Sequence, residues 1–165
     1  MAITIDGTDG ISPLKASGQT QTTTGTAASP AISSSSDTDS GIFFGTNEVN
    51  ISTGGSTRAT VDSSGRLLVG TDTARTNFAG GSTAFRMQLE GDSFPNAGLS
   101  ITRNSNNSST PTLNFAKSRG TGNSIVSSGD NTGSIFFDGN DGTNFIRSAG
   151  IQAYVDGTPG TNDMP

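Results

Sequence analysis

The stretch that decides the fold reads Arg58-Ala59-Thr60-Val61-Asp62-Ser63-Ser64-Gly65-Arg66-Leu67-Leu68-Val69-Gly70-Thr71. Ala59 and Val61 lie two positions apart, as do Leu67 and Val69, so each pair shares one face of an extended strand. Residues 62–65 between them are turn formers: Asp and Ser side chains bond to nearby backbone, and Gly adopts positive φ at little cost. The stretch therefore predicts a β-hairpin.

Short apolar runs of the same kind recur along the rest of the chain, separated by clusters of Gly, Asn, Asp, Ser and Pro. Such spacing is typical of an all-β protein. No window free of Gly and Pro has helical periodicity behind a capping residue, so we expect almost no helix. The expected strands are Ile42-Phe43-Phe44, Val49-Asn50-Ile51, the two arms of the hairpin, Phe85 to Glu90, Leu99/Ile101, Leu113/Phe115, Ile125-Val126, Ile135-Phe136-Phe137, Phe145-Ile146 and Ile151/Ala153/Val155.

The composition is poor in the residues that build a core. Of 165 residues only 29% are hydrophobic and 14% charged, with 23 Gly, one Tyr and no Trp. A compact monomer normally has nearly half its residues apolar, counting Gly. Such a shortage fits either a disordered chain or an extended one whose core forms between chains or between stacked repeats. The alternating strands favour the second class, and periodicity alone equally allows a β-solenoid monomer.

Charge and cysteine content exclude several classes of partner. The formal net charge is −5, and the nine Lys and Arg residues form no cluster, so the chain lacks the basic stripe of a nucleic-acid-binding groove. No segment is apolar enough to insert in a membrane, and the N-terminus lacks the pattern of a secretory signal. The absence of Cys means no disulfides and suits synthesis in a reducing cytoplasm.

The residue types argue against catalysis, a metal site or a cofactor. The absence of His rules out Ser-His-Asp and Cys-His arrangements and zinc ligation by imidazole. The turn that starts at Asp138 has Gly142 and Ala149 at positions five and twelve, where a calcium-binding EF-hand loop needs oxygen ligands, so it predicts ordinary Asx turns. The carboxylates sit mainly in solvated turns, which do not raise the pKa of a glycosidase acid.

The chain divides into four parts on composition. Residues 1–14 read as a short strand and turn, residues 15–40 as a Ser/Thr-rich extended connector, 41–71 as a first β module with the hairpin, and 72–165 as a second β module. The stretch from Ser40 to Asn47 is similar to that from Gly133 to Asn140, which indicates related units in a beaded, extended architecture.

The order of these motifs resembles a known family. Ser40-Gly41-Ile42-Phe43-Phe44, then Ser52 to Arg58, then the Asp62-Ser63-Ser64-Gly65-Arg66 hairpin ending in Gly70-Thr71, is similar to the repeat of bacteriophage tail fibres, particularly those of marine and cyanobacterial phages. Residues 85–165 are similar to the unit that often follows. The resemblance implies a parallel, interwoven homotrimeric β shaft. The residues expected in the trimer core are Ile42, Phe44, Val61, Leu67, Val69, Phe85, Met87, Leu89, Ile135 and Phe137.

The resemblance also implies a role for the N-terminal segment. The opening is similar to the end of such fibres that attaches to the tail, where strand addition would join it to a tail tube, adaptor or baseplate protein. The expected docking residues are Ile3, Ile5, Asp6, Ile11 and Leu14. The implied function is a structural virion protein, made in the host cytoplasm, that anchors the fibre and supports host recognition by a distal part. The sequence stops at Pro165 where family members continue, so we expect a longer fibre.

Two other functions remain open on the sequence. One is a carbohydrate-binding module or depolymerase fragment that touches the host surface directly. The other is a bacterial adhesin stalk, and the missing secretory signal argues against it. The phenylalanine pairs are candidates for stacking sugars, although strand aromatics more often serve core and inter-chain contacts. The side chain of Arg66 is expected to face solvent or a neighbouring chain.

Overall fold

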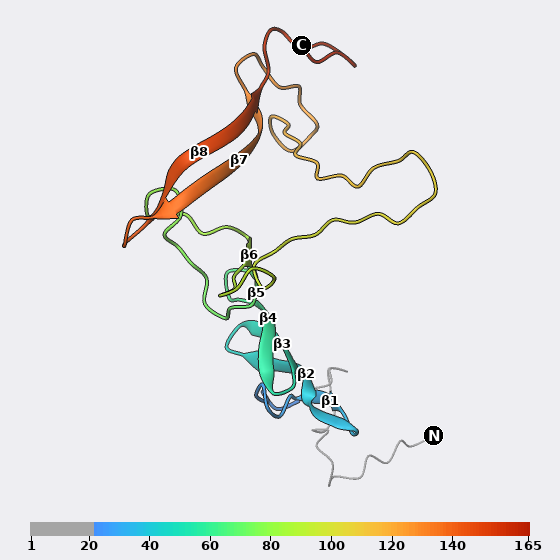
Figure 1. Ribbon diagram of the computed structural model, residues 1–165, viewed down its shortest axis with the longest axis vertical. Coiled ribbons are helices and arrows are strands. Elements are labelled where there is room, and N and C mark those ends of the chain that lie inside the picture. The colour runs from blue at the N-terminus through green and yellow to red at the C-terminus, as the bar shows by residue number, and fades with distance from the viewer. Residues whose placement is uncertain (1–21) are drawn as a thin grey trace. The chain divides into compact units, whose positions relative to one another are not determined.

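A computed structural model describes residues 22–165 of the chain, and within that range all regular structure is β (Figure 1). The all-β prediction is thus confirmed. The predicted docking segment, with Ile3, Ile5, Asp6, Ile11 and Leu14, lies outside the described residues. The strands are β1 (Ile32–Ser34), β2 (Asp37–Gly45), β3 (Glu48–Thr53), β4 (Ser56–Val61), β5 (Leu67–Val69), β6 (Met87–Leu89), β7 (Asn131–Asn140) and β8 (Phe145–Tyr154).

The described residues form two compact units. The first comprises residues 22–75 and 85–98 and holds a six-stranded sheet in the order β1-β2-β3-β4-β5-β6. The second comprises residues 76–84 and 99–165 and holds the two-stranded sheet β7-β8. Residues 85–98, which the sequence places in the second module, thus belong to the first unit, because β6 pairs with β5.

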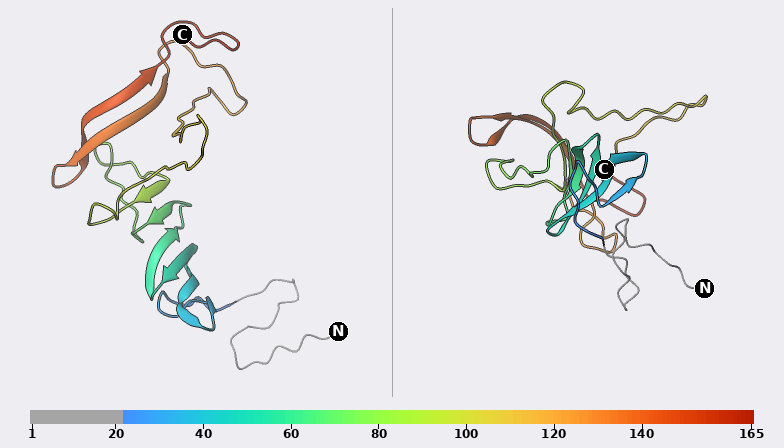
Figure 2. Two further views of the ribbon diagram at one scale, coloured as in Figure 1. Left: turned by 45° about the vertical axis from the view of Figure 1, so that its right-hand side comes forward. Right: turned by 90° about the horizontal axis from the view of Figure 1, so that it is seen from below.

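The first sheet is a meander in which each strand lies beside its neighbour in sequence (Figure 2). The pairs from β1-β2 to β4-β5 are antiparallel, and β5-β6 is parallel. The parallel pair requires a crossover, which residues 70–86 supply. Strand β6 is shorter than the predicted run from Phe85 to Glu90.

The predicted hairpin is confirmed in detail. Ala59 pairs with Val69 and Val61 with Leu67 across β4 and β5. Between them the Gly65 N–H donates to the Asp62 carbonyl over 2.8 Å, and Gly65 has φ 70°, a conformation that glycine adopts without steric cost. The hairpin therefore sets which side chains of β4 and β5 share a face.

The sheet begins earlier in the chain than expected. Strand β1 and the first half of β2 fall within the segment predicted as an extended connector, and Ile32 pairs with Ile42. The Phe44 N–H also donates to the Thr24 carbonyl over 2.7 Å, so the chain before β1 adds to the same edge. These strands are rich in Ser, Thr and Asp, so the sequence shows no apolar periodicity there. They form because their main chain pairs with a neighbouring strand.

The second unit is built on one long hairpin. The residues predicted as separate strands at Phe145-Ile146 and Ile151/Ala153/Val155 form the single strand β8, with Val155 just past its end. Segment 76–84 lies against its start: the Phe145 N–H donates to the Asn77 carbonyl over 2.9 Å, and the Phe78 and Phe145 rings stack with centroids 5.0 Å apart.

Three predicted strands are absent from the single chain. Leu99/Ile101, Leu113/Phe115 and Ile125-Val126 lie in irregular backbone, where the nearest pairing is an isolated bridge between Arg119 and Ser124. Their alternation is real, but a strand also needs a neighbouring strand to bond with, and the chain brings none beside them. The prediction of strands there is wrong for one chain by itself.

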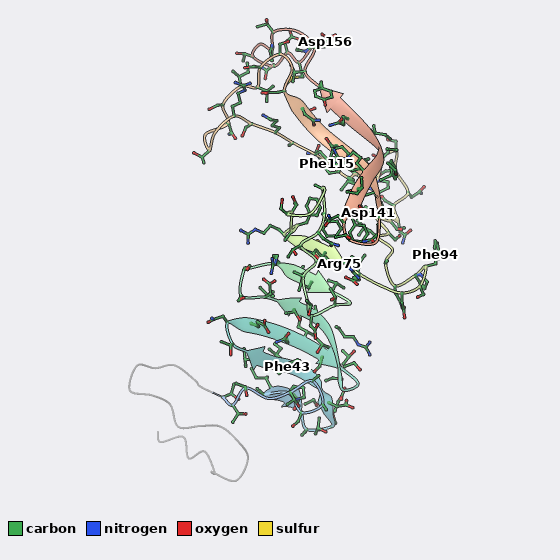
Figure 3. The ribbon with its side chains drawn as sticks, turned by 90° about the vertical axis from the view of Figure 1, so that its left-hand side faces the viewer. Phe43, Arg75, Phe94, Phe115, Asp141 and Asp156 are labelled. Carbon is green, nitrogen blue, oxygen red and sulfur yellow. The ribbon has the colours of Figure 1, made fainter. Side chains whose placement is uncertain are left out.

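The described residues contain almost no hydrophobic core. Within residues 22–165 the buried hydrophobic side chains are Leu68, Val126 and Val155. Large apolar side chains that are more than a third exposed run from Ile32 to Met164. Side chains thus project into solvent from both units (Figure 3).

Candidate functional site

One face of the first sheet carries two rows of apolar side chains. The strand register aligns the members of each row directly across the sheet. The first row is Phe44, Val49, Val61, Leu67 and Met87, and the second is Ile42, Ile51, Ala59, Val69 and Leu89. We call these ten residues the apolar face. Phe44, Ala59 and Val69 are half-buried, and the other seven members are exposed, from 37% at Ile42 and Leu89 to 61% at Met87.

The opposite face of the same sheet is buried and largely polar. Leu68 is fully buried there between Thr60 and Gln88, which are 1% and 7% exposed. The Thr60 hydroxyl donates to Asn50 Oδ1 over 2.7 Å. The Gln88 amide accepts the Arg75 N–H over 2.9 Å and donates to the Arg75 carbonyl over 3.1 Å, which holds the crossover segment against the sheet. Thr60, Asn50 and Gln88 thus find hydrogen-bond partners within the chain, whereas the buried hydroxyl of Ser52 on the same face has none among the described residues.

The burial of the two faces is thus reversed relative to an ordinary monomer. A soluble protein covers the apolar side of a half-buried sheet and exposes the polar side. Here the polar side is the buried one, with the crossover bound to it at Gln88, and the apolar face is left open. A contiguous exposed apolar face is typical of an interaction surface.

The structure brings most of the predicted trimer-core residues onto this face. Phe85 stands apart, because it precedes β6 and is 50% exposed. Ile135 and Phe137 lie on β7 in the second unit. Val49 and Ile51 also belong to the apolar face, although they are not among the expected trimer-core residues. Their alternation with polar residues in β3 indicates this position in the sequence. The predicted trimer-core residues that lie in the two rows are Ile42, Phe44, Val61, Leu67, Val69, Met87 and Leu89.

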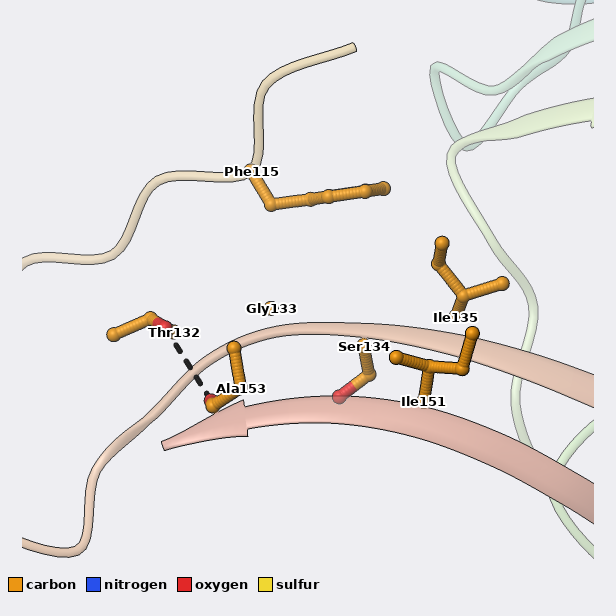
Figure 4. Close-up of a pocket in the computed structure, with 7 residues that line it drawn as sticks. All are labelled: Phe115, Thr132, Gly133, Ser134, Ile135, Ile151 and Ala153. Carbon is orange, nitrogen blue, oxygen red and sulfur yellow. Dashed lines mark hydrogen bonds between the residues drawn. The ribbon is translucent and has the colours of Figure 1, made fainter. Parts of the chain in front are cut away.

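The hairpin of the second unit has an apolar groove of its own. Ile135 pairs with Ile151 across β7 and β8, and Phe115 lies over Gly133 at one end (Figure 4). A Cβ atom on Gly133 would approach the Phe115 Cβ to 2.9 Å, so this close approach requires glycine. The groove has a volume of about 240 Å³ and is mostly lined by carbon. It can accept apolar side chains and offers no charged group.

The other face of that hairpin holds an aromatic-cation contact. The Arg147 guanidinium carbon lies 3.1 Å from the centre of the Phe136 ring. Its Nε is 3.7 Å from Asp138 Oδ1. The contact of Arg147 with Phe136 and its ion pair with Asp138 stabilise the hairpin.

The hairpin turn of the first sheet is held by hydrogen bonds and an ion pair at Asp62. Asp62 Oδ1 accepts the N–H groups of Ser64 and Arg66 over 2.9 and 3.0 Å, and Oδ2 lies 2.6 Å from Arg66 Nε. The main-chain N–H of Arg66 is the main cause that holds the pKa of the Asp62 carboxyl below its usual value. Arg66 was expected to face solvent or a neighbouring chain. Instead it binds back to Asp62, because the turn brings the two side chains within reach.

An ion-pair cluster around Asp130 fixes the base of the second hairpin. Its carboxylate accepts Arg119 Nε over 2.7 Å and Nη2 over 2.9 Å, and Lys117 Nζ lies 3.4 Å away. It also accepts the Ser127 N–H over 2.9 Å. The Arg119 hydrogen bond is the main cause that lowers the pKa of Asp130 far below its ordinary value. The cluster ties the segment before β7 to the start of that strand.

The Asp130 cluster predicts a specific acid response. Because its pKa is lower in the folded than in the unfolded state, its contribution to stability is present above about pH 4 and is lost as the pH falls below the ordinary Asp pKa. We expect Asp130→Asn to lower the melting temperature by a few degrees at pH 7, and the difference from wild type to shrink below about pH 4. Melting curves from pH 7 to 2 measure this. A difference that is the same at every pH would contradict it.

A polar hollow lies beside β4, β5 and β6 in the first unit, with a volume of about 740 Å³. Its charged groups have partners within the chain: Arg75 forms an ion pair with Glu90, and the Asn96 amide donates to Asp92 over 3.1 Å. Arg58 Nε donates to Thr53 Oγ1 over 2.8 Å. These groups are arranged for holding loops in place, and none stands as an acid and base pair over a common point.

The turn at the tip of the second hairpin consists of Asx turns, as predicted. Asn140 Oδ1 accepts the Gly142 N–H over 2.8 Å, and Asp141 Oδ1 accepts the N–H groups of Thr143 and Asn144 over 2.8 and 2.7 Å. Within residues 22–165 no three His, Cys, Asp or Glu side chains gather as metal ligands. The same range contains no helix of the length and apolarity needed to cross a bilayer.

Comparison of the chain with protein-family models, with curated proteins and with solved structures finds no match in any of the three.

Proposed function

We propose that the chain is the anchor and proximal shaft of a bacteriophage tail fibre, a structural virion protein that assembles as a homotrimer. The observation that carries the proposal is the apolar face: ten side chains are aligned across a sheet whose polar side is buried, and seven of them are exposed. An interwoven trimer would place these faces toward one another and supply the core that each chain lacks.

The energetics of a single chain favour such a partner. Ordering a residue costs about 1–2 kcal/mol of backbone entropy, and burial of apolar surface is the main compensation. Within residues 22–165 only Leu68, Val126 and Val155 are buried hydrophobic side chains. Covering the remaining surface of a half-exposed Val, Ile or Leu contributes about 1 kcal/mol each. A partner that covers the apolar face therefore supplies the stabilisation that the fold needs.

A copy of the same chain fits as that partner. Exposed large apolar residues run from Ile32 to Met164, so the covering surface must extend along both units. A parallel copy is as long as the chain by construction. The apolar face carries no charge, so identical faces meet without like-charge repulsion. The proposed number of three chains in the assembly is taken from the resemblance to tail fibres.

The remaining roles in the proposal follow from the same resemblance. The N-terminal segment would dock on a tail tube, adaptor or baseplate protein, and host contact would belong to a more distal part of the fibre. The proposed location is the virion, and the proposed role is non-enzymatic. A carbohydrate-binding or depolymerase role is the alternative that the experiments below would reveal.

Light scattering on the purified chain tests the central claim. We expect a mass three times the 16.6 kDa of one chain, together with a β-type circular dichroism spectrum. A folded monomer at micromolar concentration would contradict the trimer. Sugar release from host envelopes, or binding of the isolated chain to a glycan array, would instead favour the carbohydrate-directed alternative.

Deletion of residues 2–14 is expected to separate assembly from attachment. The deleted segment lies outside the residues that the structure describes and contains none of the expected trimer-core residues, so the trimer should still form. Strand addition through Ile3 and Ile5 would be lost, and incorporation into particles should fall to background. Western blotting of purified particles measures this. Normal incorporation of the shortened protein would show that the fibre docks through another part.

A further inference from the structure

Among the described residues, the second unit contains a long segment without hydrogen bonds from main chain to main chain. Residues 99–118, here called the arm, follow the last residues of the first unit in the sequence and precede Asp130. None of the described main-chain to main-chain hydrogen bonds has a donor or acceptor in the arm. A structureless segment of this length is uncommon in a compact domain, and unpaired backbone groups need partners when they are buried.

The sequence of the arm is nevertheless that of a strand at its start. Leu99 and Ile101 alternate with Ser100 and Thr102, and both apolar residues are exposed, at 72% and 45%. Two apolar residues in a period-2 pattern, followed by the β-branched pair Ile101-Thr102, favour a half-buried strand. The run 99–103 therefore has strand-forming side chains and free backbone groups, and lacks only a neighbour.

A free sheet edge is present in the same unit. Strands β7 and β8 form a two-stranded sheet, and such a hairpin is marginal without a third strand. The outer edge of β8 is partly occupied near Phe145 by the main chain of residues 77–80. Among the described residues no strand pairs with the outer edge of β7, which is ten residues long.

Within the described residues the arm does not pair with its own β7. Its far end is fixed across the face of the hairpin, because Phe115 lies over Gly133 and Lys117 forms an ion pair with Asp130. From there the arm leads away from β7 and β8 as an open loop (Figures 1 and 2). The run 99–103 is thus directed away from the edge that it would complete.

We propose that residues 99–103 of one copy add as a strand to the outer edge of β7 in a second copy. Leu99 and Ile101 would then cover the apolar surface of the partner beside its Ile135, next to the groove under its Phe115. The inference rests on the proposed homotrimer and assigns a segment and an edge to one of its contacts. It also explains why the alternation at residues 99–101 has no strand partner within one chain.

Proline substitutions test the main-chain pairing. In a strand, alternate N–H groups point to the neighbour, so one of the adjacent positions Thr102 and Arg103 must donate to β7. We expect either Thr102→Pro or Arg103→Pro to lower the melting temperature of the trimer by roughly 5 °C or more. Ser108→Pro, near the tip of the arm, is the matched control and should be neutral. If both strand variants melt like wild type, the inference is wrong, because proline is tolerated in an unpaired extended segment.

Hydrogen exchange and cross-linking separate this inference from the proposed function. In the wild-type oligomer, amides of residues 99–103 should exchange at least about tenfold more slowly than those of 105–109. The chain has no Cys, so Ser100→Cys with Ser134→Cys gives a unique pair for a short bis-maleimide, and covalent oligomers are expected. Equal exchange rates, or a linker confined to single chains, would overturn the inference while a measured trimer still supports the proposed function. A monomeric wild-type mass would overturn both.

Discussion

Val61→Glu is expected to abolish assembly of the chain and, with it, most of its β structure. Val61 lies in the middle of the first row of the apolar face, paired with Val49 on one side and Leu67 on the other. In a trimer built on this face, three carboxylates would be placed among apolar side chains. Burying an unpaired charge costs several kcal/mol per ion, so the concentration needed for assembly should rise at least about a hundredfold.

The same substitution has the opposite expectation if the chain folds alone. Val61 is 44% exposed in one chain, so a glutamate there would reach water and change stability little. Light scattering and circular dichroism at the same concentration therefore separate the two cases. Ser56→Glu adds the same charge at the start of β4, outside both rows, and should leave the trimer intact. If Val61→Glu assembles like Ser56→Glu, the apolar face is not the contact between copies.

The sequence was sufficient to predict those parts of the fold that depend on local patterns. The turn from Asp62 to Gly65 formed as expected, because short polar side chains and one glycine specify it without help from the rest of the chain. The alternation in β4 and β5 also placed Val61, Leu67 and Val69 on one face. These features are local, so their residues carry the whole signal.

The features that the sequence did not reveal depend on neighbours distant in the chain. Thr60 and Gln88 alternate with apolar residues, yet they are buried: Thr60 binds Asn50 of the neighbouring strand, and Gln88 binds a crossover that no local pattern predicts. Strand β1 forms from Ile32-Ser33-Ser34 because the edge of β2 is beside it. Conversely, Leu99 and Ile101 have the pattern of a strand and no neighbour. In all three cases contact with a neighbouring segment, rather than the intrinsic propensity of the residues, decides the outcome.

A pair of alanine substitutions at adjacent residues of β5 measures how fully the apolar face is covered. Leu68 is completely buried within one chain, and Leu67 points to the opposite face and is 38% exposed. Leu68→Ala removes a packed side chain whatever the state of assembly, and should cost about 2–5 kcal/mol per chain. The cost of Leu67→Ala depends on what lies above it.

If copies cover the apolar face, Leu67 is as buried as Leu68, and the two substitutions should lower the free energy of unfolding by amounts within about 1 kcal/mol of each other. If the face stays open, the part of Leu67 that is already in water contributes nothing, and its truncation should cost only about 1 kcal/mol. Denaturant unfolding at two protein concentrations gives both values. Should either variant be too unstable to purify, Leu67→Val and Leu68→Val make the same comparison with a smaller loss. A large cost at Leu68 beside a small one at Leu67 would argue that each chain folds alone, since the neighbours then differ only in which face of the sheet they occupy.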